Sequence, residues 1–178
     1  TTNNGISLDA DQFEYDKNLN ILKAFGNVII NDEINEIKIV SDDIVYLRNE
    51  EKIFTNTESK AISNDTIIKA NSFNYNKKLN ILNAKGNAKV EDLVKNYNII
   101  SDEITYFKNL EKFISKSKSE AFDENLTIKA NEFEYNKLLN TVNANGNVIV
   151  DDKIENLLIF SESITYLKNR EKIFTQGN

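Results

Sequence analysis

The stretch Ile68-Lys-Ala-Asn-Ser-Phe-Asn-Tyr75, followed after a turn by Asn83-Ala-Lys-Gly-Asn87, decides the fold of this chain because it occurs three times. The other two copies span residues 8–15 with 23–27, and residues 128–135 with 143–147. Their glycines, Gly26, Gly86 and Gly146, follow one another at intervals of 60 residues. A fixed period in this range predicts an array of repeated units.

Weaker relatives of the motif lie midway between these copies. They share the pattern small–x–x–apolar–x–Tyr and span residues 41–46, 101–106 and 161–166. The true unit is therefore about 30 residues long and is used six times, which makes the 60-residue spacing a double repeat.

The hydrophobic pattern within each unit has the period of β-strands. One face of the first return stretch carries Leu22, Ala24, Gly26, Val28 and Ile30. The same alternation recurs in the two later copies, and no window keeps a 3.6-residue period over the ten to twelve residues that a helix needs. We therefore expect an essentially all-β chain, in which Val148 points inward and Asn147 points outward.

Each outgoing stretch changes phase once. After Ala10 the next apolar residues are Phe13 and Tyr15, three and five positions on rather than two and four. Such a slip sends side chains to the opposite face unless the strand bends or bulges, and Gly inside a strand often marks a bend. We expect each strand to fold over a corner, so that its two halves lie in two different sheets. Clusters of Asn, Asp and Lys predict hairpin loops of four to five residues, and hence about 12 bent antiparallel strands stacked in order.

Repeat-equivalent positions should then form columns along the stack. The corner column is small and consists of Ala10, Ser41, Ala70, Ser101, Ala130 and Ser161. It would leave a trough if the sheets do not close tightly. A tyrosine column precedes the turns, and we expect its rings inside and its hydroxyls in water: Tyr15, Tyr46, Tyr75, Tyr106, Tyr135 and Tyr166. Two asparagine rows should make turn and ladder hydrogen bonds: Asn20, Asn80 and Asn140, and Asn27, Asn87 and Asn147.

Composition argues against several classes of protein. The net charge of −6 disfavours a nucleic-acid partner, because phosphate binding needs a basic face. The chain has no Cys and no His, so it has no thiolate chemistry, no His general base and no His metal ligand. The paired acids, such as Asp42-Asp43 and Asp151-Asp152, follow the repeat, whereas a catalytic site breaks symmetry. We expect no enzyme activity, no catalytic or metal-binding residues and no cofactor.

These motifs resemble those of the OstA-like family of lipopolysaccharide-transport proteins. The family pattern is roughly apolar–x–Ala–Asp–x–apolar–x–Tyr, a turn, and Ala–x–Gly–Asn–Val–x–apolar. It stands in residues 8–15 with 24–30 and again in residues 128–135 with 144–150. The middle copy departs from it, with Asn71 in place of Asp and Ala88 in place of Val. The resemblance covers nearly the whole chain and implies an elongated, V-shaped antiparallel β-jelly roll.

The resemblance also implies an apolar interior trough that shields the acyl chains of lipopolysaccharide. The inward positions that would line it are Leu8, Ala10, Phe13, Leu22, Val28, Ile30, Ile39, Ile44, Ile68, Phe73, Leu82, Val90, Ile99, Ile104, Ile128, Phe133, Val142, Val148, Val150, Ile159 and Ile164. Sugars and phosphates would stay in water. Other jelly-roll transport proteins of the family would join the open β-edges.

Within the family, the chain most resembles the N-terminal periplasmic domain of the outer-membrane translocon, with the periplasmic bridge protein as the other candidate. Residues 174–178 align with residues 142–147, so the chain stops in mid-repeat. We expect residues 1–178 to be a single domain, either a fragment of or a module within a larger assembly, with a C-terminal outer-membrane barrel as a further partner. Its place would be the periplasm, in association with the outer membrane. No signal peptide and no Met are present, so we expect the chain to begin after processing or to be cut from a longer one.

Two other interpretations of the function stay open. In the first, the chain is a β-solenoid-like structural or adhesin repeat with a closed core and with binding on its outer faces. In the second, weaker reading it is a carbohydrate-active β-fold, although it lacks an asymmetric pair of acids. An apolar fluorescent probe distinguishes a trough from a solid core, because only a trough binds it in the native state.

Overall fold

The computed structural model describes residues 2, 3 and 5–176 and is almost entirely β-structure. In chain order the elements are β1 (Thr2–Asn3), β2 (Ile6–Asp9), β3 (Gln12–Asp16), β4 (Ile21–Asp32), β5 (Ile37–Leu47), β6 (Lys52–Thr55), β7 (Ser59–Ser63), β8 (Thr66–Ala70), β9 (Ser72–Asn76), β10 (Ile81–Asp92), β11 (Tyr97–Phe107), the 3-10 helix η1 (Lys108–Leu110), β12 (Lys112–Phe122), β13 (Leu126–Asn136), β14 (Thr141–Asp152), β15 (Leu157–Leu167), the 3-10 helix η2 (Lys168–Arg170) and β16 (Lys172–Gln176).

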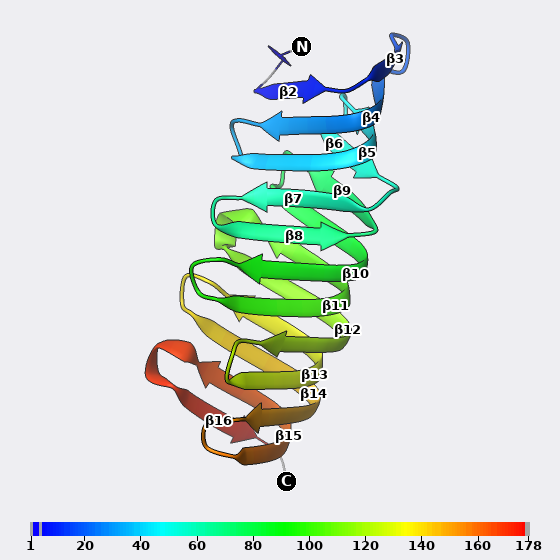
Figure 1. Cartoon of the computed structure of the whole chain (residues 1–178). Coiled ribbons are helices and arrows are strands. Elements are labelled where there is room, and N and C mark those ends of the chain that lie inside the picture. Colours follow the sequence, from blue (N-terminus) through cyan, green and yellow to red (C-terminus); the bar gives the residue numbers. More distant parts are fainter. Residues whose placement is uncertain (1, 4, 177–178) are drawn as a thin grey trace.

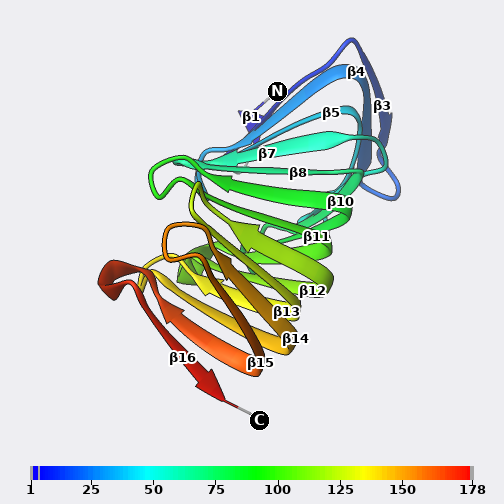
Figure 2. The same cartoon turned by 60° about the horizontal axis from the view of Figure 1, so that its bottom comes forward.

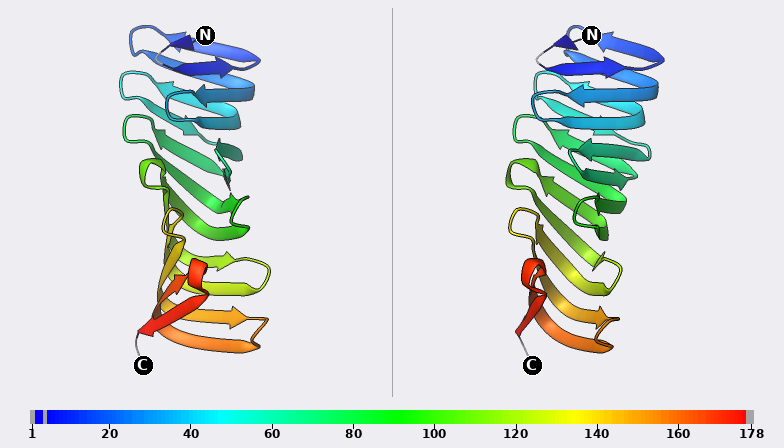
Figure 3. Two further views of the ribbon diagram at one scale, coloured as in Figure 1. Left: turned by 90° about the vertical axis from the view of Figure 1, so that its left-hand side faces the viewer. Right: turned by 60° about the vertical axis from the view of Figure 1, so that its left-hand side comes forward.

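The strands stack in chain order along one long axis, with the two ends of the chain at opposite ends of the stack (Figure 1). All pairs are antiparallel, and from β10 to β16 each strand pairs with the strands next to it in the sequence. Figure 3 shows the same elongated body from two other sides, with each long strand curving from one layer into the other. The predicted fold class, an elongated antiparallel β-jelly roll, is confirmed.

The strands fold over a corner at the glycines that the sequence singled out. Gly86 has φ +76° and Asn87 has φ +50°, and the pairing of β10 with β11 shifts register between Lys85 and Ala88. A Cβ on Gly86 would lie 2.7 Å from the amide nitrogen of Asn71 on the facing corner, whose backbone N–H donates to the Gly86 carbonyl at 2.9 Å. The left-handed backbone and the close approach both require glycine here.

The corners of the weaker units use other residues. In β12 the left-handed positions are Ser117, with φ +71°, and Lys118, with φ +45°, and the register shifts between Lys116 and Ser119. The phase slip in the sequence therefore marks the corner in every copy that carries it, but glycine does so only in every second return strand.

Two predicted details of the sheet differ from the structure. All strands belong to one 16-stranded sheet whose ladder shifts register at the corners, so the two halves of each strand lie in two layers of that sheet rather than in two sheets. The expected 12 bent strands become 16 because corners divide three of them, into β2 and β3, β6 and β7, and β8 and β9, and because β1 adds a short strand beside β2.

Two rows of turns face each other on the side opposite the corners (Figures 1 and 2). The first row, which we call row A, consists of the turns 17–20, 48–51, 77–80, 108–111, 137–140 and 168–171. The second, row B, consists of the turns 33–36, 64–65, 93–96, 123–125 and 153–156. We call the line where the two rows meet the mouth of the jelly roll.

The predicted turn asparagines hold neighbouring turns of row A together. Asn80 has φ +57°, a conformation that Asn tolerates well, and its side-chain amide donates to Asn109 at 2.8 Å. Asn20 and Asn140 repeat this bond with Asn49 and Asn169, at 2.7 and 2.5 Å. The second predicted row, which includes Asn87, supplies left-handed residues at the corners.

A single hydrophobic core runs through the stack from Ile6 to Tyr166. The strand phase is as predicted: Val148 is 1% exposed, whereas Asn147 lies exposed on the outer face. The interior therefore belongs to one continuous apolar column rather than to six separate cores.

Candidate functional site

All but one of the residues predicted to line the trough belong to this interior or pack against it, and most are closed off by protein. Those that are buried are Leu8, Val28, Ile30, Ile39, Ile44, Ile68, Phe73, Leu82, Val90, Ile99, Ile104, Ile128, Phe133, Val142, Val148, Val150 and Ile164. Ala10, Leu22 and Ile159 are half-buried against the same core, and Phe13 is 49% exposed. The middle of the body is thus a packed core in this state, and contact of these residues with lipid stays a prediction.

The corner column, which was expected to leave room, is filled by polar contacts. Ser59 donates to Ser41 at 3.0 Å and lies 2.7 Å from Thr55, and the Thr55 hydroxyl accepts from the backbone N–H of Phe73 at 2.9 Å. Ser119 donates to Ser101 at 3.0 Å in the next double repeat. Buried hydroxyls with partners cost little, so small corner residues here allow the layers to close.

Aromatic rings fill the middle of the interior. Tyr106 and Phe113 stack with their centroids 4.4 Å apart, and Tyr135 lies 6.0 Å from Phe113. Tyr97, which sequence reasoning did not single out, lies 5.2 Å from Tyr135 and is fully buried. Its position two residues before Ile99 on an alternating strand is the signal that could have identified it.

The mouth is closed by buried ion pairs that sequence reasoning missed. Lys77 lies 3.9 Å from Asp32, Lys168 lies 3.2 Å from Asp123, and Lys137 lies 3.6 Å from Asp92 and also contacts Asp65. In each pair the cation comes from row A, and the carboxylate lies either in row B or on the last strand residue before it. The available signal was a basic residue in every turn of row A, consisting of Lys17, Arg48, Lys77, Lys108, Lys137 and Lys168.

The tyrosine hydroxyls take part in the same closure, and the expectation that they are wet is wrong for the middle of the body. Tyr75 donates to Asp32 at 2.8 Å and Tyr135 donates to Asp92 at 3.1 Å, both in buried surroundings. Burial, and then the adjacent carboxylate, hold the pKa of each of these two phenols well above its usual value. Only Tyr15 of the column is exposed, at 44%.

Burial and neighbouring groups at the mouth also shift the pKa values of its charged side chains. A hydrogen bond from Lys137 lowers the pKa of Asp65. Burial acts to raise the pKa of Asp123, but hydrogen bonds from the backbone N–H groups of Leu126 and Asn125, together with Lys168, bring it below its usual value. Burial lowers the pKa of Lys168, whose ammonium group lies 3.6 Å from the centroid of the Tyr97 ring.

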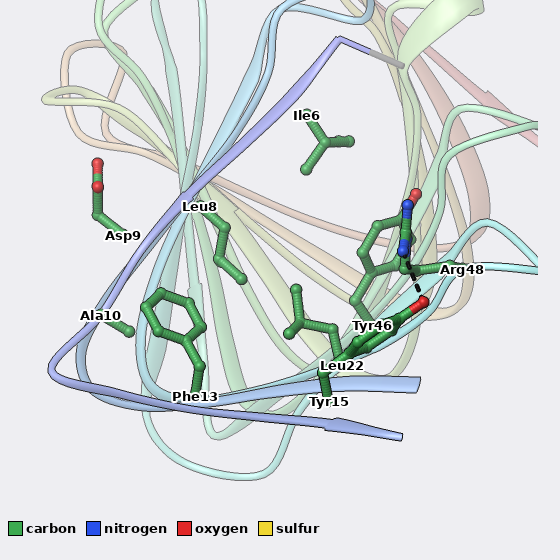
Figure 4. A pocket seen from close by; sticks show the side chains of 9 residues that line it. All are labelled: Ile6, Leu8, Asp9, Ala10, Phe13, Tyr15, Leu22, Tyr46 and Arg48. Atoms are coloured by element: carbon green, nitrogen blue, oxygen red, sulfur yellow. Dashed lines mark hydrogen bonds between the residues drawn. The ribbon is translucent and has the colours of Figure 1, made fainter. Parts of the chain in front are cut away.

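An apolar cavity of about 620 Å³ opens at the N-terminal end of this interior. Its lining consists of Ile6, Leu8, Asp9, Ala10, Phe13, Tyr15, Leu22, Tyr46 and Arg48. Figure 4 shows Leu8, Phe13 and Leu22 pointing into the same space, with Arg48 bonded to the Tyr15 hydroxyl at the rim and Asp9 turned away.

The cavity exists because the first unit has a neighbour on one side only. Strand β3, which carries Phe13 and Tyr15, pairs with β4 alone, whereas the equivalent strand β9 pairs with both β6 and β10. Phe73 on β9 is accordingly 2% exposed, against 49% for Phe13. The end of the interior column beside β3 is therefore not covered by a further strand.

No family model matches the sequence, and no curated protein does. Among solved structures, the chain is similar to LptH of Pseudomonas aeruginosa, described as the LptA-homologous periplasmic component of the lipopolysaccharide transport device, with 16% identity and a TM-score of 0.39 over 79% of this chain and 82% of that one. So distant a likeness leaves the function to be read from this chain's own residues.

Acidic side chains elsewhere on the described surface do not gather into a metal site. Within residues 5–176, no three acidic side chains converge in a way that could hold a metal ion. Asp43 serves the fold, because it accepts from the backbone N–H of Asn56 and from the hydroxyl of Thr57 at the corner. The described part of the chain also contains no helix with the length and apolar character needed to cross a bilayer.

The C-terminal end of the stack exposes apolar side chains and strand edges that have no pairing partner within the described residues. The first half of β15 pairs with β14 only, and β16 pairs with β15 only. Leu157, Leu158 and Phe160 on that half of β15 are 48%, 55% and 67% exposed. An edge of this kind is a template for pairing with a further strand.

Proposed function

We propose that this chain is a periplasmic lipopolysaccharide-transport domain that shields acyl chains in its interior and hands them along a stack of similar domains toward the outer membrane. The observation that carries the proposal is the continuous apolar column, which runs from Ile6 to Tyr166 and opens at the N-terminal end in the cavity around Leu8 and Phe13. The repeat motifs that resemble those of the OstA-like family support the same substrate.

Acyl chains suit this interior because burial alone drives their binding. Each methylene group removed from water contributes about 0.8 kcal/mol, without any need for directional contacts. A column of Ile, Val, Leu and Phe side chains with few polar groups fits a passage along which a lipid moves. It does not fit a receptor that holds one molecule tightly, so we assign the domain to transport rather than to catalysis.

Entry of lipid into the middle of the body requires the mouth to open. The corner side is held by the continuous backbone ladder, whereas side-chain contacts such as Lys77 with Asp32 cross the mouth. The layers can therefore separate at the mouth without breaking the sheet. Opening would expose Val148 and its equivalents to a lipid chain.

The two open edges supply the sites for partner domains. At the N-terminal end the free edge is that of β3, and at the C-terminal end it is formed by β16 and the first half of β15. Another antiparallel β-domain that adds a strand there would extend the ladder and the apolar column together. We propose other jelly-roll transport domains as these partners, with an outer-membrane barrel at the end of the route.

A structural repeat with a solid core is the second candidate, and one observation favours it. Seventeen of the residues predicted to line the trough are buried by protein, so the middle of the body has no room for lipid in this state. The two candidates differ in whether the mouth opens when lipid is present.

Site-specific photo-crosslinking to purified lipopolysaccharide distinguishes them. A photoreactive residue replaces Phe13 in the cavity, Val148 in the packed interior, or Asn147 on the outer face as the control. Transport predicts adducts at 13 and 148 but none at 147. A folded protein that forms adducts at none of the three positions would refute the transport function and leave the structural repeat.

A further inference from the structure

The cations of row A have carboxylate partners through most of the stack. Lys77, Lys137 and Lys168 meet Asp32, Asp92 and Asp123 across the mouth, at 3.9, 3.6 and 3.2 Å. Lys108, whose side chain is 11% exposed, lies 3.9 Å from Glu36. A half-buried or buried cation in this row is therefore normally neutralised by a carboxylate in row B or on the last strand residue before it.

Arg48 is the exception. It occupies the position of Lys77 in the preceding unit, yet within residues 5–176 no carboxylate lies within ion-pair distance of it. Its guanidinium donates one hydrogen bond to the Tyr15 hydroxyl at 3.0 Å, and its central carbon lies 5.5 Å from the centroid of the Tyr15 ring. A guanidinium has five N–H donors in a fixed fork, so most of its capacity is unused.

Arg48 also stands at the rim of the apolar cavity (Figure 4). Leu8, Phe13 and Leu22 point into the cavity beside it, while Asp9 is exposed and turned away from it. A cation and a phenol hydroxyl thus lie together at the entrance of a space that is otherwise apolar.

We infer that this cavity binds an amphiphile with one anionic head group, a phosphate or a carboxylate, whose acyl chain lies against Leu8, Phe13 and Leu22. The head group would lie beside Arg48 as the carboxylate of Asp32 lies beside Lys77 in the body of the stack. The guanidinium fork matches the paired oxygens of a phosphate or carboxylate. The Tyr15 hydroxyl, which donates to Asn20 at 2.8 Å, accepts one N–H of Arg48 and so holds the guanidinium in place. This inference rests on the proposed function and specifies the head-group chemistry of its entry site.

The test compares amphiphiles that share a chain and differ in head group. Binding of dodecyl phosphate, dodecanoate and dodecyl maltoside, each kept below its micelle concentration, is measured by calorimetry on the wild-type chain and on Arg48→Gln. Arg170→Gln is the matched control, since Arg170 is exposed at the other end of the stack and its loss changes the net charge equally. Inorganic phosphate shows whether an anion suffices without a chain.

Arg48→Gln should weaken binding of dodecyl phosphate and of dodecanoate about tenfold, the effect of losing a charged hydrogen bond, and leave dodecyl maltoside unchanged. Arg170→Gln should change none of the affinities. Should Arg48→Gln fail to fold, the salt dependence of the wild-type affinities replaces it: added salt must weaken the two anionic amphiphiles and spare the maltoside.

The outcomes separate the head-group site from the transport function. Equal binding of all three amphiphiles, with no effect of Arg48→Gln or of salt, overturns the anionic site and leaves the acyl cavity intact. Inorganic phosphate that binds as tightly as dodecyl phosphate overturns the amphiphile as the ligand. Absence of binding by any of the amphiphiles overturns both the site and the function on which it rests.

Discussion

The ammonium group of Lys137 lies 3.6 Å from the carboxylate of Asp92 on the opposite side of the mouth. The same sequence offset, 45 residues, joins Lys168 to Asp123 and Lys77 to Asp32. The offset equals one and a half of the 30-residue units, so each cation reaches back across the stack rather than to its own hairpin. The ion pairs that close the mouth therefore occupy equivalent positions in successive repeats and recur along the body.

Loss of a carboxylate at the mouth should destabilise the fold strongly. Asp32 is 2% exposed and accepts from Tyr75 at 2.8 Å and from Asn35 at 2.6 Å, besides pairing with Lys77. Asp32→Ala leaves Lys77 buried without its partner, which costs about 3 kcal/mol. Urea unfolding measures this loss.

Two further variants check the cause. Asp42→Ala, on the exposed face of β5, should change stability by no more than about 0.5 kcal/mol. Adding Lys77→Met to Asp32→Ala should recover part of the loss, because an apolar side chain then replaces the uncompensated charge. No recovery in the double variant would mean that the Tyr75 and Asn35 contacts, not the ion pair, carry the effect.

The corner glycine should be intolerant of any side chain. Gly86→Ala places a Cβ 2.7 Å from the Asn71 amide at a backbone φ of +76°. The left-handed conformation alone costs a non-glycine residue about 1–3 kcal/mol, and the contact adds to it. Thermal unfolding should show the loss, whereas Lys85→Ala on the neighbouring exposed position should unfold like the wild type; equal behaviour of the two variants would contradict a tight corner.

Sequence periodicity predicts this fold well because each unit is folded by local rules. Gly86 predicts a corner, Asn80 a turn, and Val148 an inward-facing position on its strand. Each of these predictions depends only on residues one to five positions away in the sequence. What escaped prediction depends on the distance between the layers. The pairing of Lys77 with Asp32 at the mouth, and the filling of the small corner by Ser59 and its partners, appear only once the two layers are brought together.

The candidate site was likewise predictable from the sequence only in part. Alternation identifies the residues that face inward, but it does not say whether the space between them is filled. Phe13 and Phe73 have the same place in the motif, yet one lines an open cavity and the other is packed, because only β9 has strands on both sides. The number of neighbours, not the residue type, decides where a ligand could enter.

Stability should fall above about pH 10. The fold holds the pKa of Tyr75 and Tyr135 above the unfolded value of 10.0, chiefly by burial, so these phenols stay protonated in the fold while the unfolded chain ionises. The unfolded state then binds fewer protons, and stability decreases by about 1.4 kcal/mol per pH unit for each such phenol. Urea midpoints between about pH 9 and pH 12 measure how steeply stability falls with pH. Tyr75→Phe should make this slope shallower, and an unchanged slope in that variant would rule out Tyr75 as a source.

Locking the mouth should block the interior but spare the cavity. The chain has no Cys, so Asp123→Cys with Lys168→Cys creates a single pair that a short bifunctional maleimide can bridge across the mouth. With the bridge in place, lipid adducts should disappear at 148 and persist at 13, because only the first position needs the layers to separate. The same double variant without the reagent is the control. Adducts at 148 in the bridged protein would show that lipid reaches the interior along the stack instead of through the mouth.

The ends of the stack should join in a register set by the same ion pairs. Asp32 pairs with Lys77 and Asp92 with Lys137, but within residues 5–176 no cation lies within ion-pair distance of Asp152, the next carboxylate of the series. Three double repeats span 180 residues, two more than the 178 given, so a second copy that continues the ladder in the same period would place its Lys17 beside Asp152 as Lys137 stands beside Asp92. Lys17→Glu alone should weaken head-to-tail association in sedimentation velocity, since a buried like-charge contact replaces an ion pair. Mixing that variant with Asp152→Lys should restore association at the one junction where both changed residues meet, and a mixture no better than either variant alone would exclude this register.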